Sequence, residues 1–241
     1  MIKNGNPFLE KGFKNVTYQD NSMTVSGTVL KTIVLLALVG FSFIYSWLEM
    51  GAGIGKFTTI LGIAVVIALI SSLVTAFIPK ISPITAPIYA VSEGILLGYI
   101  SKLADLKFPG IVVSAILLTL ALTLATLLIY RRNPAVAGKI TRGVMIATFG
   151  VFLTYLVTFV LGFFGISLPI FGSGPIGILF SIAVIVIATL NLIVDYDFIL
   201  KNVSQGAPKY MEWYSAYGLM VTLVWLYIEI LRLLTKLKSD D

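Results

Sequence analysis

Residues 175–200 read PIGILFSIAVIVIATLNLIVDYDFIL, and no charged side chain occurs in this stretch before Asp195. A bilayer core about 30 Å thick is crossed by roughly 20 mainly apolar helical residues, because a helix satisfies its own backbone polar groups without water. Pro175 suits the first turn of such a helix. The stretch therefore predicts a transmembrane helix with two acidic residues, Asp195 and Asp197, in its last turns.

Six further stretches pass the same test of length and hydropathy, so the sequence predicts an all-α integral membrane protein with seven spans. Prolines and glycines separate several of them, as expected where helices end. The expected spans are 32–47, 57–78, 86–100, 110–130, 143–164, 175–200 and 211–234. We expect residues 1–28 to be a polar cytoplasmic tail, residues 29–235 a single seven-helix membrane domain, and residues 236–241 a short charged tail.

The composition agrees with this class: 58% of the 241 residues are hydrophobic and 12% are charged, whereas soluble domains carry about 25% charged residues. The absence of cysteine excludes disulfides and thiolate metal sites, and the absence of histidine removes the usual neutral-pH acid–base group. The net charge of +6 fits basic cytoplasmic loops better than a nucleic-acid surface. We therefore expect a lipid bilayer, and not nucleic acid, as the main partner, and no cofactor.

Lysine and arginine are distributed unequally between the two sides of the predicted bundle. Eleven fall on the side of the N-terminal tail and six on the other, which places the N-terminus in the cytoplasm and, after seven spans, the C-terminus outside. If the last span re-entered the membrane instead of crossing it, its three cations would join the first side. The eleven are Lys3, Lys11, Lys14, Lys31, Lys80, Arg131, Arg132, Lys139, Arg142, Lys201 and Lys209.

Acidic groups within a bilayer are costly to insert and are candidates for function. Asp195 and Asp197 point about 200° apart on a helix, so one is expected to face the bundle interior and the other a different partner. Asn191 shares a face with Asp195 and could form a polar strip with the Glu212 end of the next helix. Alternatively, both aspartates are solvated residues near a loop.

Two other spans carry a glutamate. Glu93 lies midway along its span, with no cation within four residues, next to a Gly94–Gly98 pair that would let another helix approach closely. Alternatively, Glu93 has a structural role, as a neutral glutamic acid that forms a hydrogen bond across a packed helix interface. Glu229 precedes Arg232 by three residues, which favours an ion pair within one helix that reaches the membrane interface.

These carboxyl groups suggest two kinds of chemistry. A carboxyl group taken out of water can change its charge near neutral pH, and a helix that packs differently in the two charge states is a pH gate. Carboxylates along a hydrated path would also attract Ca²⁺, which prefers several oxygen ligands. Three or four such donors are too few to predict a closed calcium site, so Ca²⁺ is expected, if anything, as a permeant ion.

Several strings in the chain resemble the Bax inhibitor 1 family, also called the transmembrane Bax inhibitor motif superfamily, and in particular its bacterial branch. The resemblance covers most of residues 23–237. The strings that carry it are Met23-Thr24-Val25-Ser26-Gly27-Thr28, Pro87–Gly98 with Glu93-Gly94, Ser173-Gly174-Pro175, Asn191–Ile199 and Gln205-Gly206-Ala207-Pro208-Lys209-Tyr210-Met211-Glu212-Trp213-Tyr214.

The resemblance implies a seven-helix bundle with the last helix at its centre, a pH-sensitive calcium leak, and a bacterial plasma membrane location. In the family, a Tyr-Asp pair on the sixth span and an aspartate on the seventh form a proton-sensitive gate. Tyr196-Asp197 matches the first element, whereas Thr222 stands where the second aspartate is expected. A hydroxyl cannot supply the coupling of two carboxylates, and Asp195 is a candidate for the second acid.

The alternative function is a non-transporting modulator that binds other membrane proteins through helix contacts such as the Gly94–Gly98 face. An enzyme is not expected. An intramembrane aspartyl protease needs a second aspartate on the last span, and a rhomboid protease needs a histidine; neither residue is present there. A retinal protein needs a lysine within the last span, and the predicted span ends before Lys236.

Overall fold

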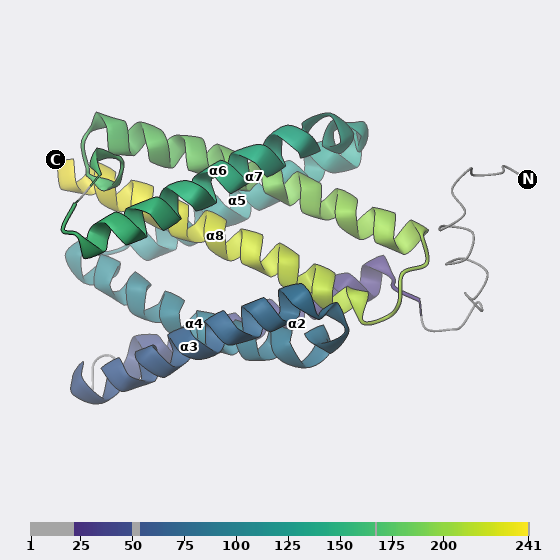
Figure 1. The fold of residues 1–241 in the computed structure, drawn as a ribbon, viewed down its shortest axis with the longest axis horizontal. Helices are drawn as coiled ribbons and strands as arrows, with labels where there is room; N and C mark the ends of the chain where they lie inside the picture. The colour runs from purple at the N-terminus through teal and green to yellow at the C-terminus, as the bar shows by residue number, and fades with distance from the viewer. Residues whose placement is uncertain (1–21, 50–53, 167, 241) are drawn as a thin grey trace, which may run out of the picture.

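The computed structural model describes residues 22–49, 54–166 and 168–240. These contain seven helices long and apolar enough to cross a membrane, which confirms the predicted fold class. Two short 3₁₀ helices, η1 (Pro79–Ile81) and η2 (Pro169–Phe171), join neighbouring spans (Figure 1). The spans are α2 (Val25–Glu49), α3 (Ile54–Phe77), α4 (Ser82–Lys107), α5 (Ile111–Arg132), α6 (Ala135–Phe163), α7 (Pro175–Ser204) and α8 (Met211–Asp240).

Several helices extend beyond their predicted ends. Helix α2 begins at Val25, inside the segment assigned to the polar tail, because Thr24 caps it by accepting a hydrogen bond from Gly27 N at 3.0 Å. Helix α4 begins at Ser82 with Pro83 in its first turn, where a proline loses no intrahelical bond, and α6 begins at Ala135, directly after its N-cap residue Pro134. Residues 1–21 of the predicted tail lie outside the described residues.

Residues 236–240, in the segment expected to be a short charged tail, are helical. Helix α8 therefore runs without interruption from Met211 to Asp240. A re-entrant segment must reverse its direction, and α8 contains no reversal. The continuous helix thus favours a seventh crossing over re-entry.

Helix α8 runs diagonally between the group α2–α3–α4 and the group α5–α6–α7 (Figure 1). It packs against α2, α4, α5 and α7. That the last helix is the central one stays a prediction, which these four contacts support. Between α7 and α8 the chain turns at Gly206, whose φ of 68° follows the last turn of α7 and whose N–H bonds to Val203 O at 3.1 Å.

Many large apolar side chains on the outer faces of the helices are exposed, including Phe41, Leu69 and Phe159. The closest helix contacts instead use small residues. An added Cβ at Gly94 would overlap Ser42 Oγ and Val39 O of α2, and one at Gly98 would overlap Phe43 O. Close backbone approach through small residues is the usual way for helices to associate in lipid.

Candidate functional site

Asp195 faces the interface between α7 and α8. Its carboxyl group interacts with the hydroxyl of Thr222 on α8, and its Oδ2 is buried without a hydrogen-bond partner in the described part of the chain. Thr222 is 9% exposed, and its hydroxyl also lies 3.2 Å from Gly218 O, to which it donates. A buried carboxyl oxygen without a partner is costly and therefore marks a position that warrants a functional explanation.

Asp197 has different partners. Its Oδ2 lies 2.5 Å from Lys201 Nζ on the same helix, and its Oδ1 accepts a hydrogen bond of 3.3 Å from the hydroxyl of Tyr130 on α5. The side chain of Lys201 is 62% exposed, so this pair lies towards the surface of the bundle. The two aspartates therefore do not share a partner, and it is Asp195 that meets Thr222.

Glu93 lies on another side of α8. Its carboxyl group interacts with the phenol of Tyr89, one turn earlier on α4. The ring of Tyr89 packs edge-on against Tyr217 of α8, with 5.2 Å between the ring centroids. The partner of Glu93 is thus a phenol of its own helix, and α8 covers this pair with a second phenol.

Asn191 does not form the strip that we expected with Glu212. Its amide donates to Thr148 Oγ1 of α6 at 2.6 Å and to Ile187 O at 3.0 Å. Glu212 instead begins α8 and faces α2, so the two side chains have separate partners. The spacing of Asn191 and Asp195 along α7 does not say which neighbouring helix each side chain meets.

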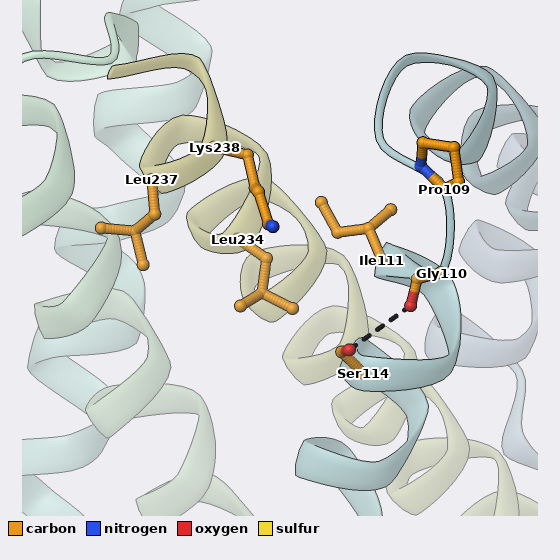
Figure 2. A pocket seen from close by; sticks show the side chains of 7 residues that line it. All are labelled: Pro109, Gly110, Ile111, Ser114, Leu234, Leu237 and Lys238. Carbon is orange, nitrogen blue, oxygen red and sulfur yellow. Dashed lines mark hydrogen bonds between the residues drawn. The ribbon is translucent and has the colours of Figure 1, made fainter. Parts of the chain in front are cut away.

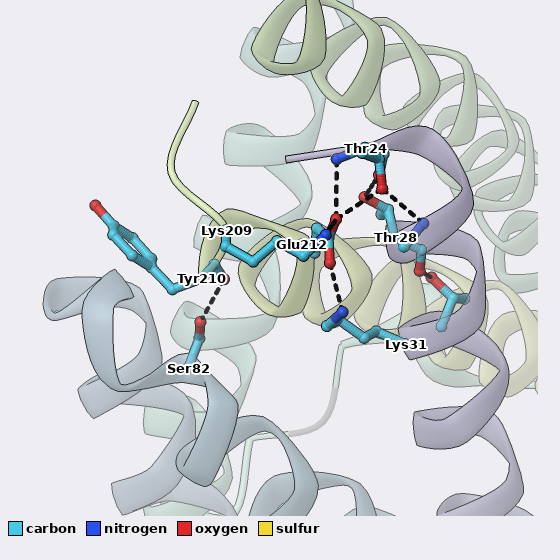
Figure 3. Close-up of polar contacts among 9 residues, drawn as sticks. Thr24, Thr28, Lys31, Ser82, Lys209, Tyr210 and Glu212 are labelled. Atoms are coloured by element: carbon cyan, nitrogen blue, oxygen red, sulfur yellow. Dashed lines mark hydrogen bonds and ion pairs between the residues drawn. The ribbon is translucent and has the colours of Figure 1, made fainter. Parts of the chain in front are cut away.

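Glu212 is the centre of a charged cluster that ties α2 to α8 (Figure 3). Its buried carboxylate forms ion pairs with Lys31 of α2 and, at 2.8 Å, with Lys209. It also accepts hydrogen bonds from Thr24 N at 2.9 Å and Thr24 Oγ1 at 2.8 Å. The threonine that caps α2 is therefore itself held by the first turn of α8.

Glu229 forms the predicted ion pair with Arg232, at 3.1 Å, and its side chain is buried within the bundle, at 1% exposed. The hydroxyl of Tyr155 on α6 donates to Glu229 Oε1 at 2.6 Å and accepts from Arg232 Nη1 at 2.9 Å. The guanidinium group also lies over the rings of Tyr155 and Phe171. This three-residue network joins α8 to α6.

Lys236 is buried, and its hydrogen-bond partners among the described residues are all neutral. Its ammonium donates to Ile170 O at 3.0 Å, Gly177 O at 2.9 Å and Ser181 Oγ at 2.9 Å. It thereby ties the end of α8 to η2 and to the start of α7. Lys238 is exposed and extends into a hollow of 280 Å³ between α8 and the start of α5 (Figure 2).

The carboxyl groups that lie against α8 or on it are thus spread along this helix, and no three acidic side chains of the described residues come together as a metal site. Asp195 with Thr222, Glu93 with Tyr89, and Glu229 with Arg232 occupy separate places around this helix. The residues that the sequence predictions missed are mostly phenols and lysines, namely Tyr89, Tyr130, Tyr155, Lys31 and Lys236. Of these, only Lys31 carried a signal, as a lysine near the start of a span.

A comparison with known protein families matches residues 6–239 to the family described as Bax inhibitor 1 like. The chain belongs to the Bax inhibitor 1 like family. The match covers all seven helices, up to Ser239 of α8, which agrees with the resemblance of the short strings. Neither the curated proteins nor the solved structures that were compared with the chain match it. The assignment of the chain to the family therefore rests on this match, and the roles of individual residues rest on the geometry.

Proposed function

We propose that this member of the Bax inhibitor 1 like family is a pH-sensitive calcium leak whose gate is the contact of Asp195 with Thr222. The observation that carries the proposal is the buried Oδ2 of Asp195, which lies at a helix interface without a hydrogen-bond partner among the described residues. Asp197, which is paired with Lys201 and Tyr130, flanks the gate and lies nearer the cytoplasmic end of α7.

Hydrogen-bond chemistry explains how this contact responds to protons. The Thr222 hydroxyl has one hydrogen, and in the observed arrangement it donates to Gly218 O. A neutral Asp195 can then donate its own hydrogen to Thr222, whereas an ionised Asp195 cannot. Ionisation therefore requires Thr222 to turn towards Asp195 or water to enter between α7 and α8. The two charge states favour different packing of these helices, which is what a proton gate needs.

The depth of the acidic groups supports a path along α8. At 1.5 Å per residue, Asp195 lies about 14 Å from the end of α7, Glu93 about 16 Å from the start of α4, and Thr222 about 16 Å from the start of α8. These three ends lie on the same side of the bundle because successive helices alternate in direction. Glu93 and Asp195 are thus acidic groups at a similar depth beside one helix, suited to attract a cation.

The proposed setting is the plasma membrane of a bacterium, with the N-terminus in the cytoplasm and the C-terminus outside. The excess of lysine and arginine on the side of Lys80, Lys139 and Lys209 supports this orientation. The alternative, a non-transporting modulator, loses its predicted binding surface. The Gly94–Gly98 face is already filled by α2.

The test is calcium flux into vesicles. The full chain, reconstituted into vesicles that contain a calcium dye, is compared with protein-free vesicles between pH 6 and 8. The proposal predicts a protein-dependent flux that changes with pH. No flux at any pH would leave the modulator as the better function.

A further inference from the structure

A lateral groove separates α2 from α5. Both helices pack against α8, yet they barely contact each other. The space between them has a volume of 560 Å³ and is floored by Val224 and Tyr227 of α8. Leu36 and Ile44 of α2 and Leu120 of α5 line it and are exposed, so the groove opens sideways from the bundle towards the bilayer.

The hydroxyl groups in the walls of this groove are already engaged in hydrogen bonds. Thr119 and Thr123 donate their hydroxyl hydrogens to carbonyls of their own helix, both at 2.7 Å. The hydroxyl of Tyr227 is paired with Ser101 at 2.6 Å. The remaining lining side chains are aliphatic or aromatic. An occupant must therefore be apolar over this part of its length, because a polar group here would lose its hydrogen bonds to water.

One end of the groove becomes polar. A second hollow of 370 Å³ shares Phe43 and Ile44 with the first and continues past Trp47 to Asp105 and Gly110, where α4 ends and α5 begins. At this rim the ammonium of Lys102 lies 4.5 Å from the ring centroid of Trp47. Asp105 is engaged with the backbone, accepting a hydrogen bond from Gly110 N at 2.9 Å. The rim therefore joins an interfacial tryptophan to a cation that no described ion pair neutralises.

The groove also has the length of one leaflet. From Leu36 to Trp47, helix α2 rises about 16 Å, and half of a bilayer core of about 30 Å is about 15 Å. We propose that the groove holds one acyl chain of a phospholipid from the leaflet on the Lys102 side, with the phosphate at Lys102. The apolar walls take the chain, and the cation at the rim complements the charge of the headgroup.

The proposal is tested by filling the groove. Gly40 lines it, and an added Cβ at Gly40 would meet no atom within 4 Å, so Gly40→Phe places a ring in open space. Gly62 on α3 is exposed and equally unobstructed, so Gly62→Phe is the matched control. The full chain is purified from phosphatidylglycerol–phosphatidylethanolamine vesicles in a mild detergent, and retained phospholipid is counted by native mass spectrometry.

Wild type and Gly62→Phe are expected to retain one phospholipid per chain, and Gly40→Phe at least tenfold less. Equal phospholipid retention in all three proteins would overturn the proposal. A dimeric wild type together with a monomeric Gly40→Phe variant would also overturn it, since the occupant of the groove would then be a second copy of the chain. A second measurement does not depend on the folding of a variant. A phosphatidylcholine with a diazirine midway along one acyl chain should label wild type within residues 36–44 and 116–123, and labelling confined to other segments would contradict the site.

Discussion

Asp195 of α7 and Thr222 of α8 face each other across two neighbouring helices, and Oδ2 of Asp195 is buried there without a hydrogen-bond partner among the described residues. The family resemblance implies two carboxylates at this position, but here the second side chain is Thr222, which cannot ionise. A single titrating group with a hydroxyl partner should respond to pH as one proton, whereas two coupled carboxylates titrate in two macroscopic steps.

Thr222→Asp is therefore expected to restore a carboxylate pair. Two acids at this interface cannot both ionise easily, so the calcium flux should change with pH in two steps or over a wider range than in wild type. Flux measurements at closely spaced pH values, fitted for one or two transitions, provide the test. Thr222→Val is the control, since it keeps the side-chain shape and adds no acid. A single transition of unchanged width in Thr222→Asp would mean that the two side chains do not interact.

Glu212→Gln is expected to destabilise the fold. The buried carboxylate neutralises Lys31 and Lys209, and a buried ion pair that loses one member costs about 3–5 kcal/mol. Unfolding in mixed micelles with increasing dodecyl sulfate measures the loss. Lys201→Gln is the matched control, because the side chain of Lys201 in its pair with Asp197 is largely exposed. Exposed ion pairs contribute at most about 1 kcal/mol to the free energy of unfolding. Equal stability of the two variants would show that the Glu212 cluster does not hold α2 to α8.

Lys236→Met should loosen the connection of α8 to η2. The substitution removes the donor for Ile170 O, Gly177 O and Ser181 Oγ, and a buried acceptor left unpaired costs about 1–3 kcal/mol. Amide hydrogen exchange of residues 170–178 should become faster, while exchange in α2 stays as in wild type. Lys238→Met, a change at an exposed neighbouring turn, should leave the exchange of both segments unaltered. Unchanged exchange in Lys236→Met would contradict the proposed tie.

The orientation can be tested directly because the chain contains no cysteine. Single cysteines in place of the exposed residues Lys139, Lys107 and Ser239 report the two ends of the bundle. In intact cells, a membrane-impermeant maleimide should label the variants Lys107→Cys and Ser239→Cys and should label Lys139→Cys only after the membrane is opened. The reverse pattern would invert the proposed topology. Protection of Ser239→Cys together with Lys139→Cys in intact cells, with Lys107→Cys labelled, would contradict a seventh crossing.

The sequence predicted the seven spans because each depends on local hydropathy, which the chain displays directly. It also predicted the pair of Glu229 with Arg232, since residues three apart on a helix are neighbours. It did not predict that Glu212 would meet Thr24 and Lys31, which lie far away in sequence. Such contacts depend on how the helices pack, and hydropathy carries no information about which helices become neighbours.

The same limit applies at the candidate site. The periodicity of α7 showed that Asp195 and Asp197 point in different directions, but it did not identify the partner of either. The family resemblance emphasised Asp197, whereas the structure brings Asp195 to Thr222 and leaves Asp197 with Lys201. Asn191 was misassigned for a related reason, because its partner Thr148 lies on the preceding helix α6 and not on the following helix α8.

The most direct test of the proposed gate is the calcium flux of Asp195→Asn in reconstituted vesicles between pH 6 and 8. Asparagine keeps the shape of a neutral aspartic acid and cannot ionise, so the variant should show at every pH the flux that wild type reaches at its low-pH limit. Asp197→Asn should keep a pH-dependent flux, because Asp195 remains. A wild-type pH profile in Asp195→Asn, or loss of pH dependence in Asp197→Asn alone, would contradict the assignment of the gate to Asp195.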